Sequence, residues 1–387
     1  MAEPTKISSS SQLSPSVPPS GDRGLRIIIA GGGTGGHIFP AIAIANAIKN
    51  KKPDTEFLFV GAKGKMEMEK IPQAGYRIEG LDIAGFNRSS LIKNISLPFK
   101  LIKSFFRVSE IIKSFRPDAV IGVGGYSSYP VLRTAQGKGI PTFIHESNSF
   151  AGKSNIMLGK KATKIFTAST AMEKFFPAEK ILVTGNPVRH MISYNLVPRE
   201  KALDFFGLST EKKTVLAVGG SLGAKTINEA IDNNLKLFAQ NNIQLIWQTG
   251  TPYFEKAKDV TKGVTGVYVK DFIMQMDCAY AAADVIISRS GAMAVAELCL
   301  VKKPVIFVPY PFAAEDHQSA NALALVNKDA AISIKDGDAG SDLIPTLFDL
   351  LQDTTKQINM KNNIAAFGVK NADEIIATEI LKNINRA

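Results

Sequence analysis

The sequence of 387 residues has few of the residue types that build disulfide frameworks and metal sites. Only two cysteines occur, Cys278 and Cys299, and they form no C-x-x-C pair. This excludes a disulfide-stabilised scaffold and favours a reducing compartment such as the cytoplasm. The four histidines include no H-x-x-x-H pair, so no metal site is expected. Long hydrophobic runs are also missing, because stretches such as RIIIA (26–30) and PVIFVP (304–309) have strand length, whereas a bilayer span needs about 20 apolar residues.

The N-terminal segment has few apolar residues. Residues 1–24 are rich in Ser and Pro and contain no apolar core of the kind that a secretory signal has. So little apolar surface cannot offset the entropy that ordering would cost. We therefore expect residues 1–24 to form a disordered tail.

Positive charge is concentrated in one part of the chain. The net charge is +11, and residues 63–116 carry 11 Lys and Arg against 5 Asp and Glu, which is over half of the excess. Within residues 83–116 the only acid is Glu110, and apolar side chains alternate with the cations. This pattern favours an element that faces anionic lipid, and the alternative is a core helix with a solvated basic face. The candidate membrane-facing residues are Phe86, Arg88, Lys93, Phe99, Lys100 and Lys103. No nucleic-acid-binding motif accompanies them, so no nucleic-acid partner is expected.

Three kinds of strand recur in the same order in both halves of the chain, two that end in glycine and one that is introduced by proline. The paired stretches are RIIIAGGGTGG and TVLAVGGSLGA, DAVIGVGGY and DVIISRSGA, and PTFIHESN and PVIFVPYP. Strands that alternate with helical stretches predict βαβ units and a parallel sheet. We therefore predict an α/β protein of two doubly wound domains, 25–190 and 191–369, with a final helix within 370–387. Ligands bind beyond the carboxyl ends of such strands, so the Gly-rich loops are expected to line a cleft between the domains.

The loop AGGGTGGHIFP (30–40) matches the G-x-G-x-x-G template of dinucleotide-binding proteins. Its glycines let the backbone approach a phosphate, and the next helix offers unpaired N–H groups. An NAD site also needs an acidic residue at the end of the second strand, but that strand ends in Gly61, Ala62 and Lys63. The NAD interpretation is therefore disfavoured, which leaves a different phosphate loop or a turn without a ligand. In the second half, Ser221 of GGSLGA either donates to a phosphate or nucleoside or caps a helix.

Three more strand-end loops contain polar residues. In SRSGAMAVAELCL (288–300) a helix is expected to start near Ala292, and a helix N-terminus suits a diphosphate. Glu297 in this helix can accept hydrogen bonds from two ribose hydroxyls, and the alternative is a solvated surface glutamate. The stretch AAEDHQSANA (313–322) has amide side chains that suit sugar hydroxyls, although an ordinary loop and helix cap would look similar. In HESNSFAG, His145, Glu146 and Asn148 follow another strand.

These motifs together resemble a known family. GGTGGH, GVGGY, HESN, GNPVR, GGSLGA, RSGA followed by Glu, and EDHQSANA have the order and rough spacing of the peptidoglycan N-acetylglucosaminyltransferases that convert lipid I to lipid II. The resemblance covers about residues 25–385. It implies a GT-B fold of two Rossmann-like domains facing an interdomain cleft, with the C-terminal helix (370–387) packing back on the first domain.

The resemblance also implies the reaction and its location. The donor is UDP-N-acetylglucosamine, and the acceptor is undecaprenyl-diphospho-N-acetylmuramoyl pentapeptide. The product linkage is β-1,4, formed with inversion and without a cofactor or metal. The protein is expected to lie peripherally on the cytoplasmic face of the cell (inner) membrane, with other cell-wall synthesis proteins as partners.

The family's donor-site residues can be carried over where the motifs match. They are Thr34, Gly35, Gly36, Asn148, Arg189, Ser221, Ile273 (whose backbone reads the uracil), Ala292, Met293, Ala294, Val295, Ala296, Glu297 and Gln318. Ala294 and Ala296 stand where the family often has a hydroxyl residue, so the diphosphate would depend more on backbone N–H groups. Ser147 and His317 stand where the family can have glutamine, which alters the sugar contacts.

The transfer needs a base for the acceptor hydroxyl, and His37 is the first candidate because imidazole titrates near neutral pH. Glu146 is the competitor, either as the base or as the group that orients His37, and Tyr126 is expected near the acceptor diphosphate. The alternatives are another UDP-sugar GT-B transferase, a UDP-sugar epimerase, and a lipid- or nucleotide-binding protein without catalysis.

Overall fold

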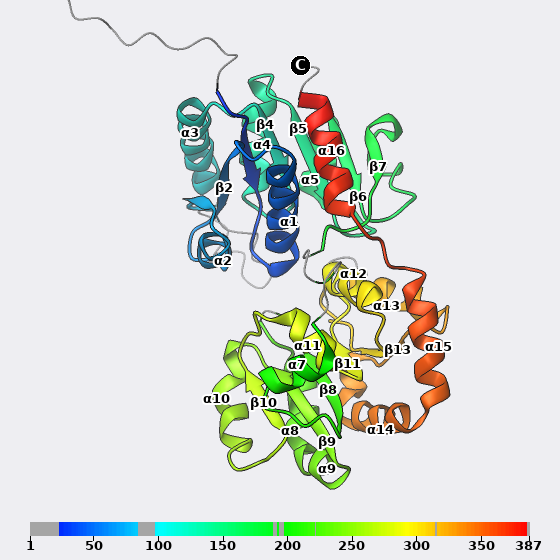
Figure 1. The fold of residues 1–387 in the computed structure, drawn as a ribbon. Coiled ribbons are helices and arrows are strands. Elements are labelled where there is room, and N and C mark those ends of the chain that lie inside the picture. Colours follow the sequence, from blue (N-terminus) through cyan, green and yellow to red (C-terminus); the bar gives the residue numbers. More distant parts are fainter. Residues whose placement is uncertain are drawn as a thin grey trace, which may run out of the picture.

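The computed structural model describes residues 23–83, 97–188, 192, 197–220, 222–313 and 316–384, which form two domains around two parallel sheets (Figure 1). The first sheet has the strand order β3-β2-β1-β4-β5-β6-β7. Its strands are β1 (Arg26–Ala30), β2 (Glu56–Ala62), β3 (Arg77–Leu81), β4 (Ala119–Gly122), β5 (Thr142–Glu146), β6 (Lys164–Thr167) and β7 (Ile181–Val183). The order reverses at β1, and β1 and β4 are neighbours, so the loops after these two strands meet at the switch point of the sheet.

Helices cover both faces of the first sheet. They are α1 (Gly35–Lys51), α2 (Glu67–Gln73), α3 (Leu97–Phe115), α4 (Ser128–Gly137) and α5 (Lys153–Gly159), with a 3₁₀ turn η2 (Ala178–Lys180) and the C-terminal α16 (Ala372–Ile384). Ile27 and Ile29 of β1 pack on the side of α1 and α16, whereas Ile28 of the same strand packs on the side of α3, α4 and α5. A strand buried on both faces must be apolar throughout, which explains why RIIIA does not alternate with polar residues.

The second sheet has the strand order β10-β9-β8-β11-β12-β13. Its strands are β8 (Lys213–Val218), β9 (Ile243–Gln248), β10 (Val267–Lys270), β11 (Val285–Ser288), β12 (Val305–Phe307) and β13 (Ile332–Ser333). The helices are α7 (Arg199–Phe205), α8 (Lys225–Asn233), α9 (Leu235–Gln240), α10 (Thr251–Val260), α11 (Met276–Ala282), α12 (Ala292–Val301), α13 (His317–Val326), α14 (Ala339–Gln352) and α15 (Thr354–Ala365), with a 3₁₀ turn η4 (Asp336–Asp338). The predicted architecture of two doubly wound parallel-sheet domains is confirmed.

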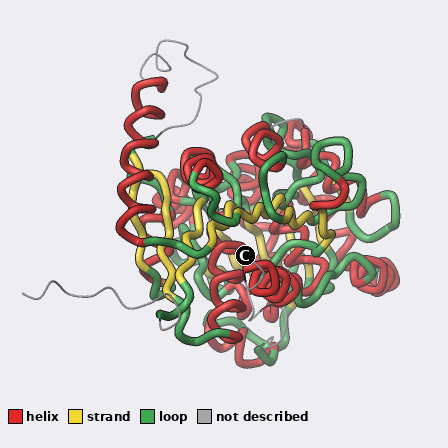
Figure 2. Tube along the Cα trace, turned by 90° about the horizontal axis from the view of Figure 1, so that it is seen from above, coloured by secondary structure: helices red, strands yellow, loops and turns green. Residues whose placement is uncertain are grey.

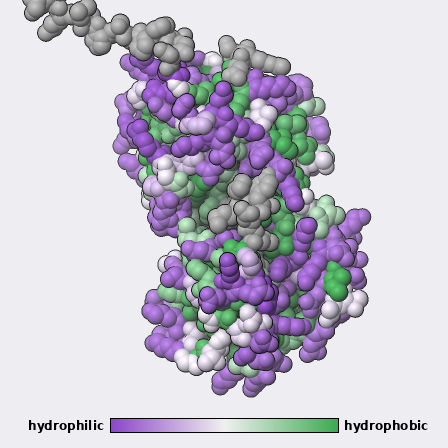
Figure 3. All heavy atoms as spheres, viewed as in Figure 1, coloured by the Kyte–Doolittle hydropathy of each residue, from purple (hydrophilic) through white to green (hydrophobic). Residues whose placement is uncertain are grey.

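The C-terminal helix α16 contacts α1 of the first domain, although the chain before it belongs to the second domain (Figure 1). Ile376, Ala377 and Ile380 of α16 are fully buried in the same core as the inner face of α1. Seen from above, the strands lie between helices on either side (Figure 2). The space-filling view shows two lobes that meet at a narrower waist (Figure 3).

Parts of the predicted organisation lie outside the described residues. The predicted boundary at residues 190/191 is among them and stays a prediction. Of the predicted tail, Arg23 and Gly24 belong to the described chain, and Arg23 pairs with Asp118 at 2.8 Å. Within the described ranges, no helix combines the length and the apolar character that crossing a bilayer requires.

Candidate active site

Two glycine loops touch at the switch point of the first sheet. Gly32, after β1, donates its N–H to the carbonyl of Gly124, after β4, at 3.3 Å. A Cβ atom on Gly31 would lie 2.4 Å from the Val123 side chain, and one on Gly125 would lie 2.5 Å from the carbonyl oxygen of Gly32. The close backbone approach therefore leaves no room for side chains, which explains why GGG and GVGG both end buried strands.

A buried carboxylate that the sequence analysis missed supports the first loop. Glu67 of α2 is 1% exposed, and its two oxygens accept the N–H of Gly33 at 2.8 Å and the N–H of Ala62 at 3.0 Å. In the sequence Glu67 is one acid in a basic stretch, and no local signal distinguishes it from a surface residue. Its position shows that α2 holds the loop that precedes α1.

His37 lies in the first turn of α1, directly against the second glycine loop. Its Nδ1 is 2.9 Å from the carbonyl oxygen of Gly32. Because a carbonyl oxygen only accepts, this contact requires a proton on Nδ1. A Cβ on Gly124 would lie 2.7 Å from Nε2, so glycine at this position, with φ of +99°, leaves space for the imidazole. The geometry thus fixes the orientation of the ring, with Nδ1 toward Gly32 and Nε2 toward Gly124.

Glu146 holds its own loop together. Its Oε1 accepts from the backbone and side-chain N–H groups of Asn148 at 3.1 and 3.3 Å, and its Oε2 accepts from Gly152 at 3.1 Å and from Asn155 at 2.8 Å. Four donors occupy the carboxylate, and the partner of His37 Nδ1 is Gly32, not Glu146. A catalytic part for Glu146 stays a prediction, which these contacts do not favour. Asn148 is held beside it through the same bonds.

His145 is the fully buried neighbour of Glu146. Neither of its ring nitrogens has a hydrogen-bond partner at bonding geometry among the described residues. The pKa of His145 is lowered to about 4, mainly by burial, with an opposing effect of the Gly185 backbone and a smaller lowering effect of His37. The imidazole is therefore neutral at physiological pH.

The two domains meet at helix N-termini. Helix α1 contacts α12, and neither helix has a side-chain cap or an acidic residue in its first turn. The side-chain N–H of Asn186 joins the carbonyl of Ser147 in the first domain at 3.1 Å to the carbonyl of Ala292 in the second at 3.4 Å. Uncapped helix starts carry unpaired N–H groups and partial positive charge, so this junction favours an anion. Thr34, Gly35 and Gly36 form the start of α1, and Ala292, Met293, Ala294, Val295 and Ala296 form the start of α12.

Two predicted donor-site residues of the second domain, Glu297 and Ile273, are bonded to neighbouring side chains. The hydroxyl of Tyr280 on α11 donates to Oε2 of Glu297 at 2.9 Å. Ile273 donates its backbone N–H to Oε1 of Gln248 at 2.9 Å, so its carbonyl group, and not its N–H, is the part that can meet a base. The sequence analysis did not find Tyr280 or Gln248, since neither belongs to a motif.

Gln318 lies at the start of α13, beside the loop that leads into α12. Its Oε1 accepts the backbone N–H of Tyr310 at 3.0 Å, and its backbone carbonyl accepts from the hydroxyl of Ser290 at 2.8 Å. Asn321 on the same helix donates to the Ser290 carbonyl at 3.0 Å. These bonds hold Gln318 in place, and among the described residues no hydrogen bond engages its amide NH₂, a group that can donate to a sugar hydroxyl.

The remaining predicted residues are placed as follows. Tyr126 follows the second glycine loop and is exposed. On α3, Phe99 is exposed, Lys103 is exposed, and Lys100 pairs with Asp82 at 3.2 Å. Arg189, Ser221, Phe86, Arg88 and Lys93 lie outside the described residues.

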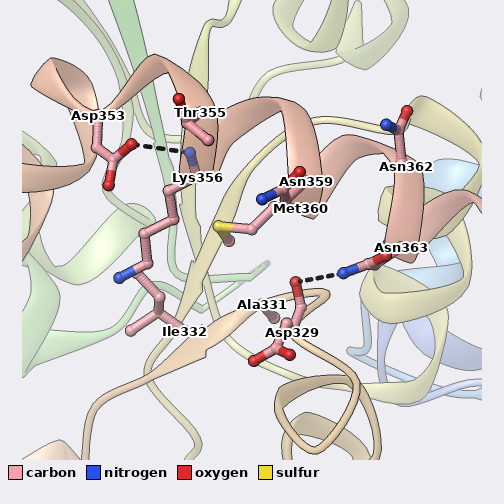
Figure 4. Close-up of a pocket in the computed structure, with 10 residues that line it drawn as sticks. All are labelled: Asp329, Ala331, Ile332, Asp353, Thr355, Lys356, Asn359, Met360, Asn362 and Asn363. Atoms are coloured by element: carbon pink, nitrogen blue, oxygen red, sulfur yellow. Dashed lines mark hydrogen bonds between the residues drawn. The ribbon is translucent and has the colours of Figure 1, made fainter.

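A cavity of about 520 Å³ lies elsewhere, between α15 and the segment around β13 (Figure 4). Its lining includes Asp329, Lys356 and Asn363, and no predicted site residue takes part. The described residues contain no cluster of three or more His, Cys, Asp or Glu side chains that could hold a metal ion.

Comparisons with known proteins identify the family. The model of the glycosyltransferase family 28 N-terminal domain matches residues 27–167, and that of the family 28 C-terminal domain matches residues 214–376. The chain is 51% identical over 366 residues to the UDP-N-acetylglucosamine–N-acetylmuramyl-(pentapeptide) pyrophosphoryl-undecaprenol N-acetylglucosamine transferase of Parabacteroides distasonis, covering 94% of this chain and 100% of the relative. It is 50% identical to the enzyme of the same name from Christiangramia forsetii, covering 94% and 98% of the two chains.

Solved structures show the same relationship. The crystal structure of MurG from Acinetobacter baumannii superposes with a TM-score of 0.70 at 28% identity, covering 92% of this chain and 99% of that one. A UDP-GlcNAc 2-epimerase from Neisseria meningitidis superposes with a TM-score of 0.66 at 15% identity, covering 93% and 100%, which shows a shared fold alone. From both domain models and from relatives of half-identical sequence along nearly their whole length, the chain belongs to glycosyltransferase family 28, among the UDP-N-acetylglucosamine–N-acetylmuramyl-(pentapeptide) pyrophosphoryl-undecaprenol N-acetylglucosamine transferases.

Proposed function

We propose that this protein transfers N-acetylglucosamine from UDP-N-acetylglucosamine to the C4 hydroxyl of undecaprenyl-diphospho-N-acetylmuramoyl pentapeptide, which converts lipid I to lipid II in peptidoglycan synthesis. The observation that carries the proposal is the meeting of two uncapped helix starts, α1 and α12, beside His37. The start of α12 favours the donor diphosphate, and the imidazole of His37 in the first turn of α1 supplies a base.

Most of the donor contacts come from the second domain, and Asn148 and Arg189 add contacts from the first. The diphosphate lies at the start of α12, where the developing negative charge of the leaving UDP meets backbone N–H groups. Glu297 accepts from the ribose hydroxyls, and Tyr280 keeps its carboxylate in position at 2.9 Å. The carbonyl of Ile273 meets the uracil, and the NH₂ of Gln318 meets the sugar. Asn148, Arg189 and Ser221 complete the donor contacts.

His37 is the base in this scheme. Nε2 takes the proton from the C4 hydroxyl while that oxygen attacks C1 of N-acetylglucosamine from the face opposite UDP. The bond from C1 to the diphosphate oxygen breaks, its electron pair leaves with UDP, and the configuration at C1 inverts. The carbonyl of Gly32, 2.9 Å from Nδ1, orients the ring and stabilises the imidazolium that forms.

The acceptor approaches from the first domain, and α3 is the element that meets the membrane. The helix buries Ser104, Val108, Ile111, Ile112 and Phe115 against the sheet. On other parts of the helix, Phe99, Ile102 and Phe106 are 75%, 56% and 71% exposed. Large apolar side chains in water beside the cation Lys103 suit an anionic lipid surface. We place the protein peripherally on the cytoplasmic face of the membrane, with Tyr126 near the acceptor diphosphate, and the exposed apolar side chains of α3 support this position.

The experiment incubates the protein with labelled UDP-N-acetylglucosamine and a lipid I analogue, and follows the label into lipid. We expect transfer by the unaltered protein and a turnover about 10²- to 10⁴-fold lower for His37→Ala, with the dissociation constant of UDP little changed. Asn50→Ala, at the exposed far end of α1, is the matched control and keeps its activity.

Three outcomes would count against the proposal. Failure of the unaltered protein to label the lipid would overturn the function. Conversion of UDP-N-acetylglucosamine to a second UDP-sugar without lipid would support the epimerase alternative. Near-normal turnover of His37→Ala would overturn the assignment of the base.

A further inference from the structure

A charged side chain of the first domain stacks on an aromatic ring of the second. Nζ of Lys70, on α2, lies 5.0 Å from the ring centroid of Phe272, which lies between β10 and α11. Lysine is normally a solvated residue, yet the Lys70 side chain is only 11% exposed. A cation over an aromatic face gains most where water is excluded, as it is here.

The ammonium group of Lys70 has a fixed orientation. It donates to Oε1 of Glu69 at 2.9 Å and to Oε1 of Gln73 at 3.2 Å. Gln73 in turn donates to the same Glu69 oxygen at 3.1 Å. Two acceptors and one ring thus receive the three N–H groups of the ammonium, which makes this contact more defined than that of a freely rotating surface lysine.

Both ends of the contact lead to the donor site. On the same helix, Glu67 accepts the N–H of Gly33 at 2.8 Å, so α2 and the first glycine loop are joined. On the other side, Phe272 directly precedes Ile273, which is buried and bonded to Gln248 at 2.9 Å. The pair therefore connects the loop before α1 with the segment to which the proposed function assigns the uracil.

We propose that the Lys70–Phe272 pair is a positioning contact that holds the two domains in the arrangement that binds the nucleotide. This proposal rests on the donor site of the proposed function. A ligand that contacts both domains binds only the molecules in which they are correctly placed, so its apparent dissociation constant rises as that fraction falls. Losing the contact lowers the fraction without altering any group that touches the reacting atoms.

The test replaces Lys70 with methionine, which keeps the length and apolar packing of the side chain and removes the charge. We expect Lys70→Met to raise the dissociation constant of UDP, measured by calorimetry without acceptor, and the KM for UDP-N-acetylglucosamine by about threefold to tenfold. We expect kcat to stay within about twofold, because the chemistry is untouched. Lys70→Arg should restore affinity, since a guanidinium also stacks on an aromatic face.

Two comparisons make the result specific. Phe272→Leu should weaken UDP binding by a similar factor, and the double variant Lys70→Met/Phe272→Leu should be no weaker than either single variant. Lys65→Met is the matched control, because Lys65 is an exposed cation just before α2 with no ion pair or ring contact in the described part of the chain, and it should behave as the unaltered protein.

An unchanged UDP dissociation constant in Lys70→Met, fully additive effects in the double variant, or an equal loss in Lys65→Met would each overturn the proposal. Absence of sugar transfer by the unaltered protein would instead overturn the proposed function, and the UDP titrations would still report on the contact.

Discussion

Glu67→Gln is the substitution whose effect the structure determines most directly. The carboxylate places one oxygen on the N–H of Ala62 and the other on the N–H of Gly33. Glutamine has the same shape but only one acceptor oxygen, and its NH₂ group would face the second N–H. One backbone N–H therefore loses its partner, and water cannot replace it because Glu67 is 1% exposed.

The expected loss can be worked out from these two bonds. A hydrogen bond to a charged group contributes about 1.5–3 kcal/mol, and the bond that remains weakens because the charge is gone. Glu67→Gln should therefore lower the free energy of unfolding of the first domain by about 2–4 kcal/mol. The matched control is Glu110→Gln, whose side chain is 70% exposed and pairs with Arg107 at 3.1 Å. Such a surface pair contributes at most about 1 kcal/mol.

Urea unfolding followed by circular dichroism measures both variants. The two domains need not unfold in a single step, so the lower midpoint should appear in the unfolding transition of the first domain, and the transition of the second domain should stay at the same urea concentration. We also expect a higher KM for UDP-N-acetylglucosamine, because the loop before α1 loses one of its supports. A midpoint for Glu67→Gln equal to that of Glu110→Gln would refute the reasoning.

Two further predictions concern pH and lipid. Burial lowers the pKa of His145 to about 4, whereas the pKa in the unfolded chain is about 6.5. The contribution of this group to the free energy of unfolding is therefore complete above about pH 6.5 and falls by up to about 1.4 kcal/mol per pH unit toward about pH 4. Denaturant titrations at several pH values should find a smaller slope in His145→Asn. An unchanged slope would contradict the buried neutral imidazole. The double variant Phe99→Ser/Phe106→Ser should reduce sedimentation of the protein with phosphatidylglycerol vesicles about tenfold or more, and added salt should reduce it further. Phe205→Ser in the second domain should leave the sedimentation unchanged. Equal binding by all variants would refute docking through α3.

Much of the fold is readable from local patterns. Short apolar runs that end in glycine, with helical stretches between them, require parallel strands with covered faces, and both sheets have this form. Because β2 does not end in an acidic residue, the sequence alone disfavours the NAD interpretation. Of the predicted membrane-facing residues, Phe99 is exposed on α3, whereas Lys100 pairs with Asp82.

The sequence by itself determined the architecture, the family and the motif residues such as His37 and Glu297, because each depends on neighbours a few positions away. Only the tertiary structure decided which hydrogen-bond partners the polar groups have. Glu67 accepts from the first glycine loop, Tyr280 donates to Glu297, and Gln248 accepts from the backbone of Ile273. Glu146 accepts from four donors. A carboxylate buried among backbone N–H groups and one in solvent look identical in a sequence. Their difference arises when strands and helices far apart in the chain pack together and exclude water, which forces each buried polar atom to find a partner.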